Sequence, residues 1–565
     1  MAVPALAATM AASLAEAAPK PAAADADLGS RVYNIRTFGA KGDGKTVDTR
    51  ALQAAIDACT RDGGGLVLVP AGTFVIGSTE LKSNVTLRIA AGGTLLGSAD
   101  GTQYHAVDAI PLTGDSTLAD GNWALLYAVH AKNVTVEGPG VIDGQGHQFY
   151  APVRGGPTPA GIGGNKRPYH ILIHQCENVT VRDIDLLDCA YHSVRVIQSK
   201  RIHLDGIYIH GRVINNNDGF HFISAQYVTL SNCVVLSQDD ACALFGSCKF
   251  VTVTNCVFST RWSVFRFGGG FAENISVSNC VLYEVFGCPI KLQGSPGSRY
   301  ENLSFSNLVL KDVTGPIHIG VGPRRPREDT PAAAATPPKP AAPGFEPGNG
   351  MSTADQTPAV LRNISFSHIH GNVILTERDL PEATVVSKPN DGERNSCIVF
   401  NCVGGAIMEN VSVSDVHLRF AGGGTAEDAA RRDLPQFAGE YFMLGVLPAY
   451  GVYARGVKGL TLSNVRLQVE APDLRPAVIF DNVNDAAING LSIEGNPQAE
   501  SALRFIGSRD VLVTAARLIS PAATALQVEG AATANIVLDG GDLSRAAKTV
   551  AAVSGASASA VKVRA

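Results

Sequence analysis

Three aspartates of the sequence have the residue type and spacing expected of an acid/base site. Asp218 lies in the segment NNDGF, and Asp239 and Asp240 lie together in SQDDACAL, 21 residues further along the chain. Carboxyl groups that lie close together push their pKa values apart, so that one keeps its proton while another stays ionised. Hydrolysis of a glycosidic bond needs such a pair, because an acid protonates the leaving oxygen and a base activates water. The aspartates therefore predict hydrolytic chemistry, provided that the fold brings them together.

Two other interpretations of these segments remain open at this point. Asp and Asn are common in turns for purely conformational reasons, and NDG and QDDA are typical turn sequences. Three neighbouring carboxylates also suit Ca²⁺, which prefers oxygen ligands. Spacing alone does not decide between catalysis, turn structure and calcium binding.

A sequence repeat indicates which elements position the aspartates. Eight segments alternate apolar and polar residues, which predicts short strands with one buried face. They are NVTVRDI from Asn178, YVTLSNC from Tyr227, FVTVTNC from Phe250, NISVSNC from Asn274, NLSFSNL from Asn302, NISFSHI from Asn363, NVSVSDV from Asn410 and GLTLSNV from Gly459. In the most regular stretch the segments begin at positions 227, 250 and 274, a period of 23 to 24 residues. This period is typical of one rung of a parallel β-solenoid, so we expect the three aspartates on adjacent rungs.

The same register aligns cysteines and asparagines. Cys233, Cys256 and Cys280 recur at one position of the repeat, and each directly follows an asparagine. The chain has 11 cysteines, an odd number, so at least one stays unpaired within the chain. We expect the recurring cysteines to be stacked core thiols, and the asparagines before them to lie in turns where their amides form a ladder between rungs.

Two segments depart from the repeat. Residues 48–59 (DTRALQAAIDAC) place apolar residues at helical spacing, which predicts a short amphipathic helix that caps the open N-terminal end of the solenoid. Residues 323–357 are rich in Pro, Ala and Gly and interrupt the repeat, which resumes afterwards. We therefore expect an all-β fold in which residues 31–565 form a single parallel β-helix domain with a loop insertion at 323–357.

Charge and the N-terminal segment limit the partners and the compartment. A net charge of −5 over 565 residues gives no general field for nucleic acid or an acidic membrane, and no apolar run is long enough to cross a bilayer. Residues 1–30 are rich in Ala, with Ala15-Glu16-Ala17 resembling a signal-peptidase site. They predict a signal peptide and a secreted or periplasmic protein. The first cation is Lys20, so a disordered leader without export function is the alternative.

Four motifs in order resemble glycoside hydrolase family 28, the polygalacturonases and their relatives, between about residues 33 and 321. They are FGAKGDGKTVDTRALQAAIDAC, GGGLVLVPAGTF, EGPGVIDGQG and the pair NNDGF…QDDACAL. The resemblance implies a right-handed parallel β-helix of the pectin lyase type and inverting hydrolysis without a metal or cofactor. It implies that Asp239 protonates the leaving oxygen and that Asp218 and Asp240 activate water. The family's N-T-D motif begins at Asn216, which is thereby assigned to substrate binding.

The sequence departs from the family pattern at positions that contact substrate, which indicates a divergent branch. Trp262 stands at the histidine of the G-H-G motif, and Pro289 replaces the arginine of the R-I-K motif while Lys291 is kept. Arg266 has nearly the same offset from the cysteine of its rung as Lys291 has from its own. We therefore predict that these two cations hold an anionic group of the substrate and that Trp262 stacks on a sugar. The alternative is that Trp262 packs structurally and Arg266 is a solvated surface charge.

Three function classes follow. The first is a monomeric glycoside hydrolase that cleaves a pectic, galacturonide-containing or related polysaccharide by metal-independent catalysis. The second is a Ca²⁺-dependent β-helical polysaccharide lyase with Arg266 or Lys291 as base, whose unsaturated products absorb ultraviolet light. The third is a non-catalytic, carbohydrate-binding β-helix, which does not need aligned acids. The adjacent Asp239-Asp240 pair after Asp218 favours hydrolysis.

Overall fold

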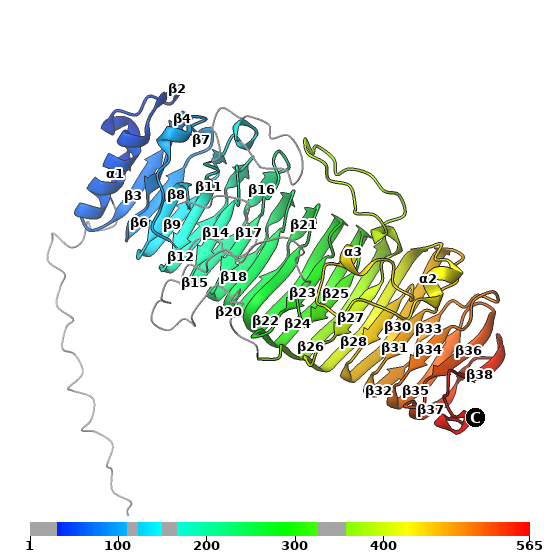
Figure 1. The fold of residues 1–565 in the computed structure, drawn as a ribbon. Helices are drawn as coiled ribbons and strands as arrows, with labels where there is room; N and C mark the ends of the chain where they lie inside the picture. The colour runs from blue at the N-terminus through cyan, green and yellow to red at the C-terminus, as the bar shows by residue number, and fades with distance from the viewer. Residues whose placement is uncertain (1–30, 110–121, 150–165, 325–356, 565) are drawn as a thin grey trace, which may run out of the picture.

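The chain forms a long right-handed parallel β-helix, as the sequence predicts (Figure 1). The structure is a computed structural model that describes residues 31–109, 122–149, 166–324 and 357–564. Every pair of neighbouring strands in these ranges is parallel, and each strand pairs with its equivalent in the next rung. A right-handed path is the one in which twisted parallel strands pack back onto each other after a crossover.

Each rung contributes to three faces, which we call the first, second and third face in the order in which the chain runs through them. The short strands of the first face are β1 (Val32–Asn34), β3 (Gly65–Val69), β6 (Val85–Ile89), β9 (Lys132–Glu137), β12 (Glu177–Arg182), β15 (Lys200–Asp205), β18 (Gln226–Ser231), β32 (Asn484–Asn489) and β39 (Val561–Arg564). Those of the second face are β2 (Asp43–Val47), β4 (Gly72–Ile76), β7 (Gly93–Gly97), β10 (Val141–Asp143), β13 (Asp185–Leu187), β16 (Tyr208–Gly211), β19 (Val234–Ser237), β21 (Val257–Thr260) and β33 (Ser492–Ile493).

The third face carries the candidate site. Its short strands are β5 (Thr79–Glu80), β8 (Ala124–Val129), β11 (Tyr169–His174), β14 (Val194–Ile197), β17 (Phe220–Ile223), β23 (Ile290–Gly294), β25 (Ile317–Val321), β27 (Ile398–Cys402), β29 (Val452–Arg455), β31 (Val478–Asp481), β34 (Leu503–Ile506), β36 (Ala522–Glu529) and β38 (Ala546–Val553). Longer strands bend from one face to the next: β20 (Cys242–Thr254), β22 (Phe265–Val285), β24 (Arg299–Val313), β26 (Val360–Val373), β28 (Ile407–Gly422), β30 (Lys458–Ala471), β35 (Arg509–Leu518) and β37 (Ala534–Asp542).

The eight repeat segments all lie in strands of the first face, in the predicted register. Val228 of β18 pairs with Val251 of β20, which pairs with Ile275 of β22. These apolar residues are buried, whereas the polar residues between them face outward. The alternation of apolar and polar residues therefore fixes both the strands and their stacking.

The aligned cysteines are buried free thiols, as predicted, and the Cys233 amide donates to Cys256 Sγ at 3.4 Å. The asparagines before them meet the ladder prediction in part: Asn307 Nδ2 of the next repeat donates to Asn279 Oδ1 at 2.6 Å, whereas Asn232 donates to Asp205 Oδ1 at 2.7 Å. A longer amide ladder forms at the first residue of the repeat, where the backbone is left-handed and favours Asn. Its rungs are Asn302 to Asn274 (3.0 Å), Asn363 to Asn302 (3.1 Å) and Asn410 to Asn363 (3.2 Å).

The predicted capping helix is α1 (Thr49–Arg61), which lies across the N-terminal end of the β-helix (Figure 1). Its apolar stripe, including Leu52, Ile56 and Cys59, is fully buried against the first rungs. Asp48 before the helix accepts hydrogen bonds from the amides of residues 41 and 42 at 2.7 and 2.9 Å. The cap removes the exposed edge that an open terminal rung would present.

Two predicted segments lie largely outside the described residues: the N-terminal leader, 1–30, and residues 325–356 of the insertion. Rungs on either side of the insertion pair directly, since β24 pairs with β26. The helices of the described ranges include none that is long and apolar enough to cross a membrane.

The turns from the second to the third face differ in length along the β-helix. They are short in the rungs that contain β17, β20, β22 and β23, but they expand to residues 374–397 and 423–451 in two later rungs. Both long segments lie along the upper edge of the β-helix in Figure 1, near the middle of the molecule. The short helices of the fold are α2 (Ala426–Ala430), α3 (Tyr441–Leu444), η1 (Ile35–Phe38), η2 (Gly101–Gln103), η3 (Gly146–Gln148), η4 (Glu393–Asn395) and η5 (Ala558–Ala560).

Candidate active site

The three predicted aspartates lie in stacked turns between the second and third faces. Asp218 precedes β17, and Asp239 and Asp240 precede β20. Backbone hydrogen bonds join the two turns: Gly219 N–H donates to the Asp240 carbonyl at 3.0 Å, and Asp239 N–H donates to the Asn217 carbonyl at 3.2 Å. The prediction that the aspartates lie on adjacent rungs is confirmed.

Asp239 has the environment of a proton donor. Burial, with the neighbouring charge of Asp240, raises the pKa of Asp239 to about 7. Its Oδ1 accepts the Asp240 N–H at 2.8 Å, and its Oδ2 accepts a hydrogen bond from Asn216 Nδ2 at 3.2 Å. Asn216, predicted to bind substrate, therefore also holds the orientation of this carboxyl group.

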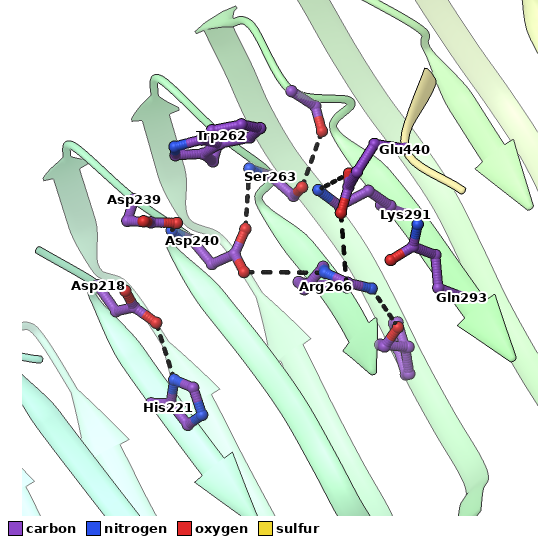
Figure 2. A network of polar contacts seen from close by, with 12 residues as sticks. Asp218, His221, Asp239, Asp240, Trp262, Ser263, Arg266, Lys291, Gln293 and Glu440 are labelled. Atoms are coloured by element: carbon purple, nitrogen blue, oxygen red, sulfur yellow. Dashed lines mark hydrogen bonds and ion pairs between the residues drawn. The ribbon is translucent and has the colours of Figure 1, made fainter. Parts of the chain in front are cut away.

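Asp240 has contacts that stabilise a carboxylate. Its Oδ1 accepts the Ser263 N–H at 3.1 Å, and its Oδ2 lies 4.0 Å from Arg266 Nε (Figure 2). The Ser263 hydroxyl in turn donates to the Gly287 carbonyl at 2.8 Å, which fixes this turn to the following rung. The two neighbouring aspartates thus differ: one carries a proton near neutral pH, and the other lies beside a cation and an amide donor.

Asp218 is buried, with 7% of its side chain exposed. Its Oδ2 lies 2.8 Å from His221 Nδ1 and 3.6 Å from His192 Nε2. Burial and the charges of Asp239 and Asp240 raise the pKa of Asp218 well above its usual value. Sequence reasoning missed both histidines, although His221 follows Asp218 by only three residues.

Within the described residues, the side chains around Asp218 form the group whose candidate ligand atoms lie close enough together to hold a metal ion. The candidate ligand atoms of His192, Asp218 and His221 all lie within 4.8 Å of one another. A metal binds an imidazole nitrogen in the plane of the ring, but these two rings are stacked, with centroids 4.3 Å apart and planes inclined by 11°. Two stacked rings do not direct their lone pairs at one ion, so the geometry fits the contact between Asp218 and His221 better than a metal.

Arg266 and Lys291 meet as predicted, but they meet at an anion of the chain itself. They are partners in the register between β22 and β23. Lys291 Nζ donates to Glu440 Oε2 at 2.6 Å, and a terminal nitrogen of Arg266 lies 3.7 Å from Glu440 Oε1 (Figure 2). Burial by itself raises the pKa of a carboxyl group, but the charges of Lys291 and Arg266 outweigh this effect and hold the pKa of Glu440 at about 2. Sequence reasoning missed Glu440.

Trp262 lies above this ion cluster in the turn before β22, half-buried. Lys291 Nζ lies 5.5 Å from the centre of its ring, and the Arg261 guanidinium lies 4.6 Å from it. The Phe442 ring, from the long segment 423–451, lies 6.1 Å away. The seven predicted site residues are thus gathered on consecutive rungs, and Arg266 is not a freely solvated charge, because only 15% of its side chain is exposed.

The other long segment, 374–397, is fixed to the turns of the same rungs. Arg261 donates to Asn390 Oδ1 at 2.8 Å, and Arg212 donates to the Pro381 carbonyl at 3.0 Å. The connections 374–397 and 423–451 therefore both reach back towards the rungs that carry the aspartates.

Comparison with known proteins agrees with the resemblance found in the sequence. Residues 59–323 match the family model described as Glycosyl hydrolases family 28. A "Probable polygalacturonase" of Vitis vinifera is 30% identical over 214 residues, which cover 37% of this chain and 43% of that protein. An "Exo-poly-alpha-D-galacturonosidase" of Dickeya chrysanthemi is 27% identical over 252 residues, which cover 37% of this chain and 41% of that protein.

These two alignments span less than half the length of each curated relative. Among solved structures, a hyperthermoactive exopolygalacturonase from Thermotoga maritima matches with a TM-score of 0.57 and 17% sequence identity. The match covers 78% of this chain and 92% of that one. At this identity, the structural match supports the fold.

Proposed function

Because residues 59–323 belong to glycosyl hydrolases family 28, we propose that this chain hydrolyses glycosidic bonds of a pectic or related polysaccharide. The observation that carries the proposal is the stacking of the two turns that hold Asp218, Asp239 and Asp240. It gives one carboxyl group with a pKa of about 7 directly beside another that faces Arg266. An acid and a base are thereby present side by side on one face of the β-helix.

In the proposed reaction Asp239 is the acid. Its proton passes to the glycosidic oxygen as the bond between that oxygen and the anomeric carbon breaks. A carboxyl group with a pKa of about 7 still carries this proton in weakly acidic solution, and it is a stronger acid than any hydroxyl of the sugar. The hydrogen bond from Asn216 supports the role, because it orients Asp239 Oδ2.

Asp240 is the proposed base, and Asp218 assists it in holding the attacking water. The water proton passes to Asp240 as the water oxygen bonds to the anomeric carbon on the face opposite the leaving group. The product therefore has inverted configuration. The Ser263 amide and Arg266 support this role, because both favour the carboxylate that must accept the proton. No metal enters the proposed reaction.

Asn216, Trp262, Arg266 and Lys291 are proposed to bind the sugar residues around the scissile bond. Aromatic rings pack against the apolar faces of sugars, and the half-buried indole of Trp262 suits this role. A polysaccharide substrate is found outside the cytoplasm, so a secreted or periplasmic location is part of the proposal.

A glycan panel with product analysis tests the proposal, with the wild type and Asp239→Asn assayed in parallel. We expect the wild type to release reducing ends from at least one pectic glycan and the variant to release almost none. Products that absorb ultraviolet light as unsaturated uronates would assign the protein to the lyases instead. Binding without cleavage across the panel would assign it to the non-catalytic β-helices.

A further inference from the structure

The site contains a carboxylate of its own where two cations meet. Lys291 is buried, with 2% of its side chain exposed, and its ammonium donates to Glu440 Oε2 at 2.6 Å. Arg266 lies 3.7 Å from the other oxygen, Oε1. In Figure 2 the Glu440 side chain points back from a later part of the chain into the space between these two cations.

Glu440 is held there as an ionised group. The charges of Lys291 and Arg266 keep the pKa of Glu440 at about 2, so its carboxyl group is deprotonated at any pH at which the enzyme would be assayed. The residue also has a fixed backbone support, because it directly precedes α3 and the neighbouring Gly439 carbonyl lies 2.8 Å from His318 Nε2. Together with Asp240, whose Oδ2 lies 4.0 Å from Arg266 Nε, Glu440 therefore balances the charges of both cations before substrate arrives.

An acidic sugar meets an unfavourable environment at such a site. Its carboxylate would have to displace Glu440 from two ion pairs or lie beside it, and like charges side by side are costly where water is partly excluded. A neutral sugar carries no such penalty. Its hydroxyl groups donate hydrogen bonds, and the Glu440 carboxylate is an acceptor with lone pairs left over after its contact with Lys291.

The aromatic residues beside the ion cluster fit the same occupant. Trp262 and Phe442 lie 6.1 Å apart, and Trp262 lies 5.5 Å from Lys291 Nζ. Phe442 follows Glu440 by two residues, so one segment supplies both the anion and an aromatic ring. A sugar ring at this place has an apolar surface for its C–H groups and a charged acceptor for its hydroxyls.

We propose that Glu440 makes the subsite beside Lys291 and Arg266 selective for a neutral sugar residue, with its carboxylate in the place that an acidic sugar would need. The inference rests on the proposed function, since it concerns the substrate of the same site. It replaces the sequence-based expectation that the two cations hold an anionic group of the substrate. In a pectic polysaccharide, this subsite would take an uncharged residue of the chain.

Binding measured by tryptophan fluorescence tests the proposal without requiring turnover. The chain has two tryptophans, so in a Trp123→Phe background the signal comes from Trp262, beside the subsite. The probes are an α-1,4-linked galacturonic acid trisaccharide and its carboxyl-reduced, neutral counterpart. We expect the neutral trisaccharide to bind at least tenfold more tightly, and Glu440→Gln to shift the affinity ratio by at least tenfold towards the acid. Glu470→Gln is the matched control, because Glu470 is also ion-paired, with Arg419 at 2.8 Å, but lies on β30 away from the site.

Equal affinity of the wild type for both probes would overturn the proposal, as would an unchanged ratio in a folded Glu440→Gln protein. Absence of a saturable signal with either probe would show that this is not a sugar subsite. If Glu440→Gln does not fold, the ratio of the affinities of the Trp123→Phe protein for the neutral and the acidic trisaccharide tests the proposal by itself. Failure of the proposed function is seen separately, as absence of cleavage across the glycan panel whatever the affinity ratio is.

Discussion

Replacement of Asp239 by Asn should stabilise the protein in alkaline solution. The folded protein raises the pKa of this carboxyl group from 3.8 to about 7, so it binds the proton more tightly than the unfolded chain does. The stability of the wild type therefore falls as the pH rises through this interval, because the folded protein must then hold an unfavourable charge. Asn is neutral at every pH and has nearly the same volume, so the variant avoids this loss.

The size of this stability change is calculated from the titration of the Asp239 carboxyl group between pH 5 and pH 7. From pH 5 to pH 7 the wild type loses about 1.4 kcal/mol per pH unit through this group, which gives about 3 kcal/mol in total. Asp239 is only half-buried, and solvent screening reduces the expected value to about 1–3 kcal/mol. Above pH 7 both states are deprotonated and the difference no longer changes.

Urea denaturation at pH 5 and at pH 8.5 measures this effect. The free energy of unfolding of Asp239→Asn, minus that of the wild type, should be about 1–3 kcal/mol higher at pH 8.5 than at pH 5. Asp485→Asn, a change at an exposed aspartate of β32, is the control for replacement of a carboxyl group by an amide. The reasoning is refuted if the effect of Asp239→Asn on stability is independent of pH.

Three further outcomes are expected. The kcat/KM for a cleaved glycan should fall above about pH 7 as Asp239 loses the proton that it donates, and a profile flat to pH 9 would exclude this acid. Activity should survive EDTA, since the two carboxyl groups supply acid and base without a Lewis acid, whereas loss with rescue by Ca²⁺ would indicate a lyase. Lys291→Met should lower the free energy of unfolding by about 3–5 kcal/mol, because it leaves the Glu440 carboxylate enclosed without its closest cation. Unchanged urea denaturation of this variant would contradict the ion pair.

Much of the fold could be predicted because the repeat fixes strands and register together. A segment such as YVTLSNC from Tyr227 buries alternate residues, and its recurrence after 23 to 24 residues leaves one way to stack. The adjacency of Asp218 and Asp239 follows from the same period. The asparagine ladder was predicted at the sixth residue of the repeat, where one rung joins Asn307 to Asn279, but the longer ladder forms at the first residue, since Asn recurs at both positions and both have a left-handed backbone.

The charge environment of the site could not be predicted in the same way. Glu440 lies 149 residues from Lys291 in the sequence, within a long turn that does not follow the repeat. The period of the repeat does not indicate where the side chains of such a turn lie in the fold. The position of the turn was a usable signal, because it occupies the same second-to-third connection that carries Asp218 and Asp239 in earlier rungs.

His221 illustrates a signal that the sequence did contain. It lies in the segment NDGFH, and it shares an outward-facing row of the third face with Arg266 and Lys291, through Ala243. Extending the alignment of that row by two rungs towards the N-terminus would have placed it beside the carboxyl groups. Its distance of 2.8 Å from Asp218 depends on side-chain rotamers, which spacing does not determine.

The central claim is that Asp239 protonates the leaving oxygen of a glycosidic bond. The most direct measurement is the rate of cleavage of a pectic glycan by Asp239→Asn and by the wild type, with the anomer released by the wild type followed by NMR. We predict inverted product from the wild type and a rate about 10²–10⁴-fold lower for the variant, with its urea denaturation at pH 5 unchanged or stabilised. Cleavage by the variant at the wild-type rate would contradict the assignment.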